Sequence, residues 1–330
     1  PLHEQYAWLA WVLLGLAGLS ALILMFRRSE QEAAIAALRD GRVVAVKGIG
    51  GYHLMCDATD PEAIGRLRRL KPRPDKPLAV MVAVTGGEPP GDGLFCYDDA
   101  ERGLLESPAR PIVLVRLADE RTDRAVLSDA VAPGLDEIGV MVPYSPLHHL
   151  LLHGREAPLI ATSANISGEP VLTDNQEAAT RLRPVADAFL QHNRPIVRPA
   201  DDPVYRRIAG EVRPLRIGRG CAPRELTIPW PQPEPLLAVG GHMKGTVALS
   251  WGRRAVVSPH IGEMDSPRSL DVFERVASDL QALYGVAAKR LVCDAHPGYT
   301  THRWAQRHGL PVETVWHHDA HASAVAAELD

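Results

Sequence analysis

Three short stretches of this 330-residue sequence carry side chains that could bind an anionic substrate. The first, KGIGGYHL, runs from Lys47 to Leu54 and holds three glycines in four positions, followed by a tyrosine and His53. Glycines that follow a strand expose backbone N–H groups, which can form a nest for an anion beside the charge of Lys47. The pattern differs from the G-x-G-x-x-G dinucleotide fingerprint. On this stretch alone, a tight turn with a solvated Lys47 and a packed His53 is the favoured interpretation.

The second stretch, RRLKPRPDK, is a cluster of cations over residues 68–76. Prolines at positions 72, 74 and 77 prevent a helix from continuing beyond Lys71. They also stiffen the backbone, so less entropy is lost when the cations bind a polyphosphate. We therefore expect Lys71, Arg73 and Lys76 to form a triphosphate clamp rather than a solvated helix face.

The third stretch, TSANISGEP, covers residues 162–170 and follows an apolar run typical of a buried strand. Its small hydroxyl and amide side chains include Ser163 and Asn165. Loops at strand ends are where open α/β sheets bind ligands, so these two residues are candidates for a binding site. An ordinary Asx or Ser turn would be the favoured interpretation if the stretch stood alone.

The elements around these stretches predict an α/β fold. A capping box at Ser29 predicts a helix to about residue 39, and Asp60 before Pro61 predicts a second helix to Leu70. Apolar runs near residues 43–46, 78–84, 111–117, 138–142 and 158–162 predict strands buried on both faces, since they lack polar alternation. Five prolines in residues 223–235 predict a stiff linker over 226–235. Beyond it we expect two hairpin strands over residues 245–252 and 254–258, a helix over 266–284 and a final helical segment.

Composition and charge narrow the class of protein. With 46% hydrophobic and 23% charged residues the chain is of ordinary globular composition, and a net charge of −4 does not indicate a general nucleic-acid binder. The four cysteines are far apart, which argues against a disulfide framework or a zinc finger. Residues 7–26 are uncharged and long enough to span a bilayer, and Arg27 and Arg28 follow them. A membrane anchor with the remainder in the cytoplasm, and a fusion or junction segment, are equally open interpretations.

The three stretches together resemble a known family. KGIGGYHLMCDATD, LRRLKPRPDKPLAVM, EIGVMVPYSPLHHLLL and TSANISGEP, in this order, resemble the YrdC-like domain of the HypF hydrogenase maturation carbamoyltransferases. Downstream, RIGRGCAP, LAVGGHMKGT, SPHIGEMDS, CDAHPGYTT and HHDAHASA resemble adjoining parts of the same family. The resemblance implies a YrdC-like twisted mixed sheet with helices over residues 29–225. It also implies that residues 236–330 are the first part of an actin-like (Kae/TsaD-like) α/β domain, and that the sequence is a fragment.

The resemblance implies a reaction as well. Family members use ATP and Mg²⁺ to convert carbamate, derived from carbamoyl phosphate, into carbamoyl-adenylate, and pass the carbamoyl group to the C-terminal cysteine of a HypE-like acceptor. By resemblance, Lys47 and His53 line the pocket for the carbamoyl-bearing substrate and Arg219 closes over the phosphates. Lys71, Arg73 and Lys76 hold the ATP phosphates, and Ser163 and Asn165 hold the nucleotide.

A last motif, HHDAH, begins at His317. His317 and His321 are four residues apart, so on a helix they share one face and can bind a metal ion together. Exposed helix histidines without a ligand are the alternative. In the family, this motif binds a divalent metal, zinc or iron, in the carbamoyl-transfer domain.

Two departures from the family leave other functions open. No acylphosphatase domain or zinc-finger modules are recognisable, so we expect the sequence not to make its own carbamate. Pro199 and Pro203 stand where the family has an arginine and a serine, and Arg198 is one position too early. Threonylcarbamoyl-adenylate synthesis is the enzyme alternative, although that family carries P-T-[DE]-T-V-Y-G-L in place of KGIGGYHL. A non-catalytic module that binds nucleotide or RNA is the alternative of another class.

Overall fold

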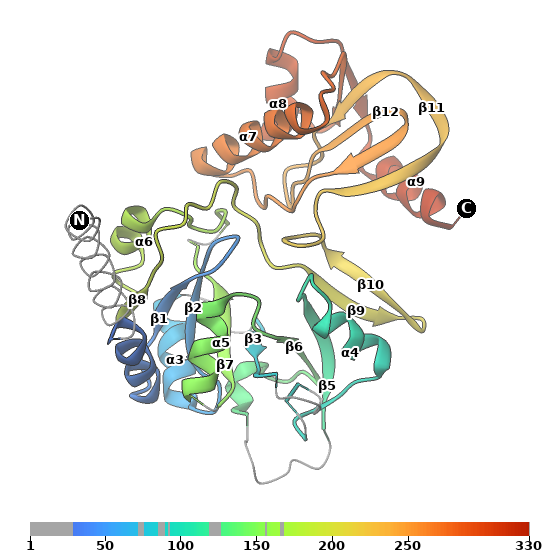
Figure 1. Cartoon of the computed structure of the whole chain (residues 1–330). Coiled ribbons are helices and arrows are strands. Elements are labelled where there is room, and N and C mark those ends of the chain that lie inside the picture. Colours follow the sequence, from blue (N-terminus) through green and yellow to red (C-terminus); the bar gives the residue numbers. More distant parts are fainter. Residues whose placement is uncertain are drawn as a thin grey trace, which may run out of the picture.

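The computed structural model describes residues 29–71, 76–84, 90–91, 93–118, 127–155, 157–165 and 168–329. They form two α/β domains, one above the other in Figure 1, and confirm the predicted fold class. The apolar segment 7–26 and Arg73 lie outside the described residues. Among the described helices, none combines the length and the apolar character that a membrane span requires.

The first domain is built on a mixed sheet, in which β3–β6, β5–β9 and β1–β8 are parallel pairs and the other pairs are antiparallel. Its strands follow the spatial order β10 (Glu211–Arg216), β9 (Val204–Ile208), β5 (Ile112–Leu117), β6 (Glu137–Met141), β3 (Ala79–Met81), β7 (Leu159–Ser163), β2 (Tyr52–Asp57), β1 (Val44–Lys47) and β8 (Ala188–Leu190), with β4 (Phe95–Cys96) on β5.

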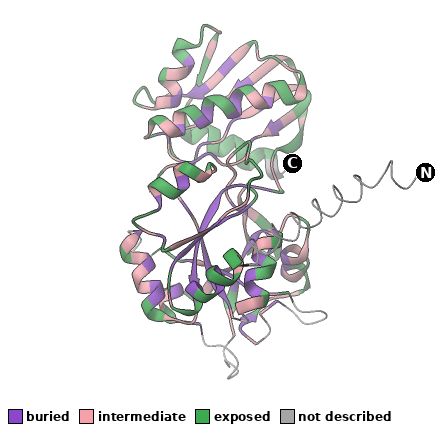
Figure 2. Ribbon diagram, turned by 60° about the vertical axis from the view of Figure 1, so that its left-hand side comes forward, coloured by how far each residue is buried: buried purple, intermediate pink, exposed green. Residues whose placement is uncertain are grey.

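Two hydrophobic clusters cover the two faces of this sheet. On one face, which we call the α3 face, the strands pack against α3 (Pro61–Leu70), α4 (Asp99–Glu106) and α6 (Asn175–Arg181). On the other, the α5 face, they pack against the helix at residues 29–39 and α5 (Pro146–Arg155). Because successive strand residues point to opposite faces, both faces need apolar side chains, which explains the continuous apolar runs. Figure 2 shows buried residues concentrated along these strands.

Helix α3 begins and ends as the sequence predicts, and its end positions Lys71. The Asp60 side chain accepts a hydrogen bond from the Glu62 N–H at the start, and Pro61 occupies the first helical position. Lys71 is the C-cap, with its N–H donated to the Leu67 carbonyl. The helix therefore ends at Lys71, beside the end of β7.

The glycine turn after β1 is a site of close backbone approach. Gly48 N–H donates to the Gly51 carbonyl (2.8 Å), and the Ala200 N–H donates to the Gly50 carbonyl (2.9 Å). A Cβ atom on Gly50 would overlap the Ala200 carbonyl oxygen. A side chain on Gly218 would likewise overlap the Asp201 backbone. Gly50 and Gly218 thus allow the segment 200–202 to pack against the sheet. Gly50, which belongs to KGIGG, therefore serves packing.

The second domain has a four-stranded sheet in the order β12 (Ala248–Val257), β11 (Arg224–Ala238), β13 (Arg290–Asp294), β14 (Val312–Val315). Its hydrophobic core lies between this sheet and α7 (Pro267–Tyr284) and α8 (Thr300–Arg307), and α9 (His317–Leu329) follows β14. The α7 bounds match the prediction, with Gly285 in the left-handed conformation after the helix.

Residues 226–235 were predicted as a linker, and this was wrong. They belong to β11, which pairs with β12 over its whole length except at two register shifts, between Thr227 and Gln232 and between Gln232 and Leu236. The prolines lie at these irregularities, where a strand tolerates the loss of an N–H donor. The predicted hairpin over residues 245–258 is also wrong, because Gly252 lies within the single strand β12.

The close approach at Gly50 gives a stability prediction. We expect Gly50→Ala to lower the free energy of unfolding by about 1–3 kcal/mol, because the new methyl group overlaps backbone that cannot rotate away. Gly103→Ala is the control, since a Cβ atom on this exposed glycine of α4 would have no other atom within 4 Å. It should be neutral or stabilise the protein by up to about 1 kcal/mol. Urea denaturation measures both, and equal stability of the two variants would contradict the packing role of Gly50.

Candidate functional site

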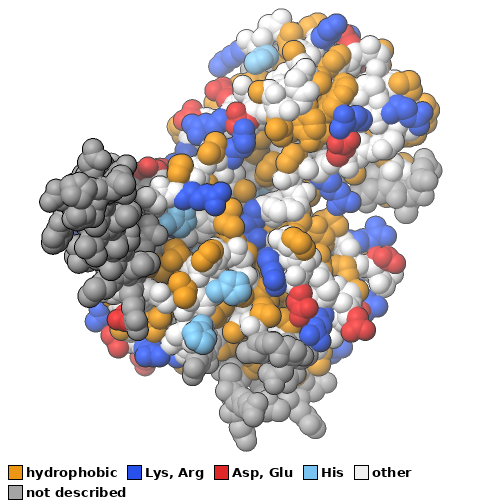
Figure 3. Space-filling view, viewed as in Figure 1, with side chains coloured by type: hydrophobic (Ala, Val, Ile, Leu, Met, Phe, Trp, Pro, Cys, Tyr) orange, Lys and Arg blue, Asp and Glu red, His pale blue; other side chains and the backbone are white. Residues whose placement is uncertain are grey.

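A cavity of about 1190 Å³ lies on the part of the α5 face that the helices leave uncovered. Its floor is made of strand residues spaced two apart, which therefore share a face: Ile112, Leu114 and Arg116 of β5, Glu137 and Gly139 of β6, Ala161 and Ser163 of β7, and Val204 and Arg206 of β9. The second domain contributes another wall through residues 260–263. Figure 3 shows Lys and Arg side chains where the two domains meet.

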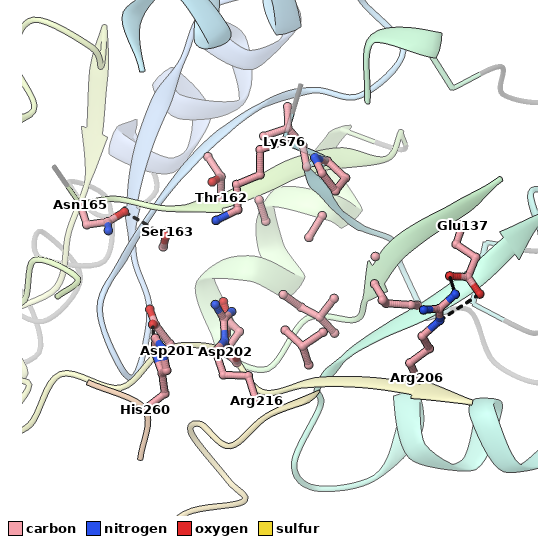
Figure 4. Close-up of a pocket in the computed structure, with 18 of the residues that line it drawn as sticks. Lys76, Glu137, Thr162, Ser163, Asn165, Asp201, Asp202, Arg206, Arg216 and His260 are labelled. Atoms are coloured by element: carbon pink, nitrogen blue, oxygen red, sulfur yellow. Dashed lines mark hydrogen bonds and ion pairs between the residues drawn. The ribbon is translucent and has the colours of Figure 1, made fainter. Parts of the chain in front are cut away.

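Lys71 and the TSAN loop are in contact beside this cavity. Lys71 is buried, and its Nζ donates to the Ser163 carbonyl and to Asn165 Oδ1 (2.8 Å). Ser163 Oγ also donates to Asn165 Oδ1 (3.0 Å), and Asn165 Nδ2 donates to the Glu169 carbonyl (2.7 Å). Ser163, Asn165 and Lys76 line the cavity, as Figure 4 shows. Ser163 and Asn165 of this wall are thus held by a lysine about 90 residues away in the sequence, which does not itself line the cavity.

Lys47 was expected in the substrate pocket, but it lies on the opposite side of the sheet. In β1 it shares the α3 face with Val43 and Ala45. Its Nζ donates to Asn175 Oδ1 (2.5 Å) and to the His192 carbonyl (3.3 Å). Burial lowers the pKa of Lys47, and the charge of Asp174 partly offsets this effect. The lysine therefore fixes α6 to the sheet and does not line the cavity.

His53 faces the cavity side of the sheet but is covered by Asp202. The His53 Nε2 atom lies 2.7 Å from Asp202 Oδ2, and the Tyr144 hydroxyl lies 3.3 Å from His53 Nδ1. This geometry fits an imidazole that donates from Nε2 and accepts from tyrosine at Nδ1. Asp202 thus lines this cavity and His53 lies behind it, and a role of His53 in a substrate pocket stays a prediction.

Arg219 supports the same carboxylate, so it does not close over the cavity as expected. Its Nε donates to Asp202 Oδ1 (2.6 Å), and its terminal nitrogens donate to the Ala109 and Arg110 carbonyls, both at 2.8 Å. The guanidinium lies 3.3 Å from the centre of the Tyr144 ring. A cation with all these partners in a buried position is fixed. His53 and Arg219 therefore hold Asp202 in place from behind the cavity wall.

Asp202 is the centre of this buried network. Burial alone would raise the pKa of Asp202, but the neighbouring His53 and Arg219 outweigh burial and hold the pKa well below its ordinary value. The carboxylate is thus charged at neutral pH. Its backbone carbonyl accepts a hydrogen bond from Arg216 Nε (2.9 Å), which places a further cation on the cavity wall.

Three arginines of the cavity were missed in the sequence. Arg116, Arg206 and Arg216 lie on β5, β9 and β10, and Arg206 forms an ion pair with Glu137 (2.8 Å). The signal that could have identified them is their position two residues from an apolar residue of the same face. Arg198, considered as a substitute for the arginine replaced by Pro199, pairs instead with Asp279 of α7 (2.6 Å) and does not line the cavity.

The two histidines predicted to bind metal lie side by side on α9. His317 Nε2 and His321 Nε2 are 3.1 Å apart, and His317 Nδ1 is 2.7 Å from Asp294 Oδ2. Both line a second cavity of about 320 Å³ with Gly240 and Gly241. Within the described part of the chain, no three His, Cys, Asp or Glu side chains are arranged to hold a metal ion. The pair therefore offers two ligand nitrogens, with Asp294 orienting one of the rings.

Comparison with known proteins identifies the family. Residues 36–218 match the family Sua5_yciO_yrdC, described as "Telomere recombination", and residues 231–328 match HypF_C, described as "HypF Kae1-like domain". The chain belongs to the Sua5/YciO/YrdC family. Its second match confirms the predicted resemblance to HypF, in which the same two domains occur in this order.

Individual HypF proteins match across both domains. The chain is 44% identical over 295 residues to "Carbamoyltransferase HypF" of Synechocystis, which covers 89% of this chain and 38% of that protein. A solved structure, described as full-length HypF in the phosphate- and nucleotide-bound form, superposes with a TM-score of 0.84 at 37% identity, over 91% of this chain and 46% of the other. The chain thus spans about two fifths of the length of the curated HypF proteins it matches.

A threonylcarbamoyl-AMP synthase and a Sua5 structure match less closely. "Threonylcarbamoyl-AMP synthase" of Vibrio campbellii is 27% identical over 158 residues, which is 46% of this chain and 80% of that protein. The Sua5 structure from P. abyssi complexed with L-threonine has a TM-score of 0.51 at 15% identity, which establishes a shared fold. The fold of this chain is thus shared beyond the HypF proteins.

The buried network gives a prediction with a defined pH dependence. Asp202→Asn leaves Arg219 without its charged partner, and we expect it to lower the free energy of unfolding by about 3–5 kcal/mol at pH 7. Because the folded-state pKa of Asp202 is depressed, its stabilisation is complete above about pH 4 and is lost as the pH falls below that value. Asp202→Asn should therefore lack this part of the acid-induced loss of stability.

Asp265→Asn is the matched control. The His242–Asp265 pair has the same 2.7 Å separation, but the Asp265 side chain is 74% exposed, so its removal should cost less than about 1 kcal/mol. Denaturant unfolding at pH 7 and pH 3 measures both variants. Equal effects of the two substitutions would show that burial of the His53–Asp202–Arg219 network has no energetic role.

Proposed function

We propose that this chain binds ATP in the cavity of its first domain and forms carbamoyl-adenylate, as a part of a HypF-type carbamoyltransferase. The observation that carries the proposal is the polar wall that Ser163, Asn165 and Lys76 form in a cavity of about 1190 Å³, with Lys71 in contact with Ser163 and Asn165. The phosphate- and nucleotide-bound form of the matching HypF structure supports it. Cavities of this size accept a nucleotide.

The reaction proposed is a nucleotidyl transfer. A carbamate oxygen attacks the α-phosphorus of ATP, a new P–O bond forms, and the bond to the bridging oxygen breaks so that pyrophosphate leaves with its electron pair. Negative charge is held on the phosphoryl oxygens throughout, and fixed cations stabilise it without a covalent protein intermediate. Lys71, Arg73 and Lys76 supply this charge in our proposal, and Arg216 is a further candidate on the cavity wall.

The carboxylates of the cavity determine where the phosphates can bind. Two of the carboxylates that line the cavity are paired with cationic side chains or histidine, Glu137 with Arg206 and Asp202 with His53 and Arg219, so neither of these two presents an uncompensated negative charge. Mg²⁺ enters with the nucleotide, whose phosphates are its main ligands, and it would supply further charge neutralisation there.

The second domain is proposed to carry the carbamoyl group onward. A divalent metal, zinc or iron, fits the His317–His321 pair, because the two ring nitrogens converge and Asp294 orients one of the rings. Such an ion would supply Lewis-acid binding of oxygen groups. The acceptor proposed is the C-terminal cysteine of a HypE-like protein. Here the first-domain cavity and the His317–His321 cavity serve successive steps.

Pyrophosphate exchange into ATP tests the proposal. We expect the full chain to catalyse exchange when ammonium bicarbonate, which forms carbamate at equilibrium, is supplied. Exchange that depends instead on threonine plus bicarbonate would favour threonylcarbamoyl-adenylate synthesis. If calorimetry shows ATP binding but neither condition supports pyrophosphate exchange, the result would favour a non-catalytic nucleotide-binding function.

Substitution of the clamp connects this activity to the cavity. Lys71→Ala combined with Arg73→Ala should abolish ATP binding, because both a charge and the support of Ser163 and Asn165 are lost. Lys289→Ala, an exposed lysine of the second domain, should leave the affinity unchanged. Unchanged calorimetric affinity of the double variant would refute the clamp.

A further inference from the structure

His260 is a residue of the second domain that lines the cavity of the first. Its Nδ1 atom lies 3.0 Å from Asp201 Oδ2, and Asp201 directly precedes the buried Asp202. Figure 4 shows the imidazole and the Asp201 carboxylate together at the end of the cavity that also holds Ser163 and Asn165. In the sequence, the stretch SPHIGEMDS stands out only for its resemblance, which assigns no role to this histidine.

Backbone contacts from both domains fix the position of His260. The His260 N–H donates to the Ile217 carbonyl of the first domain (3.0 Å). In the second domain, the Ile261 N–H donates to the Gly245 carbonyl (2.8 Å), and the Gly245 N–H donates to the Gly262 carbonyl (2.7 Å). The loop is thus ordered before a ligand enters, which reduces the entropy lost on binding.

The hydrogen bond to Asp201 leaves the second ring nitrogen available. A carboxylate that accepts from Nδ1–H fixes both the tautomer and the orientation of an imidazole. Among the residues that the structure describes, Asp201 is the only one with a polar contact to this ring, and none contacts Nε2. An oriented ring nitrogen at a cavity wall is suited to hydrogen bonding with a ligand.

We propose that His260 is a nucleotide-contacting residue, so that the second domain completes the binding site of the first. This inference rests on the proposed function, because the ligand it names is the ATP of that site. In this arrangement Asp201 is a positioning residue, and His260 Nε2 forms a hydrogen bond with the bound nucleotide. The position of the second domain then directly affects the affinity of the first for ATP.

Two substitutions separate this role from a simple contact between domains. His260→Asn retains a donor near the position of Nδ1 for Asp201 but has no group at the position of Nε2, whereas His260→Ala loses both. If Nε2 contacts the nucleotide, both variants should bind ATP about tenfold more weakly than the wild-type chain in calorimetry. If the histidine only links the two domains, His260→Asn should bind ATP with the affinity of the wild-type chain.

Asp279→Asn is the matched control, because it removes the Arg198–Asp279 ion pair between the same two domains outside the cavity. It should bind ATP as the wild-type chain does. Wild-type affinity in His260→Asn or in His260→Ala, or an equal loss in Asp279→Asn, would overturn the inference. Absence of ATP binding by the wild-type chain would instead overturn the proposed function, and circular dichroism confirms that each variant is folded.

Discussion

The cavity depends on one buried carboxylate. Asp202 is held by His53 on one oxygen and by Arg219 on the other, and Tyr144 contacts both of these residues. A charge this deeply buried is tolerated only when paired, so the sheet, the segment after β8 and the R-I-G-R-G turn must assemble together. The glycines at 50 and 218 permit that assembly, since a side chain on either would overlap the 200–202 backbone. The binding site is consequently a product of the tertiary fold.

Much of the first domain could be predicted from local signals. Continuous apolar runs predicted β5, β6 and β7, because both faces of the sheet are covered. The Asp60–Pro61 cap predicted the start of α3. Ser163 and Asn165 lie at the end of β7, as the strand-end loop predicted, and Lys71 contacts both there. These features depend on neighbours in sequence or on general sheet geometry, so a sequence is sufficient to indicate them.

Other features depend on which face of the sheet a strand residue points to, and on partners that are distant in the sequence. Lys47 and His53 are close in sequence, yet Lys47 lies on the α3 face and His53 on the α5 face, which the glycine motif does not reveal. The cations on β9 and β10 gain a shared cavity only once these strands pair at the sheet edge. The proline-rich segment is extended, as expected, but its partner β12 makes it a strand.

The central claim is that the TSAN loop, the segment around Asp202 and the loop at His260 face one nucleotide. Hydrogen–deuterium exchange of the full chain, with and without ATP and Mg²⁺, tests this most directly, because bound ligand slows exchange where it orders the backbone. We expect residues 160–165, 200–204 and 258–263 to be protected together at the same ATP concentration. Protection confined to one of these segments, or present only around residues 240–245, would contradict a shared site.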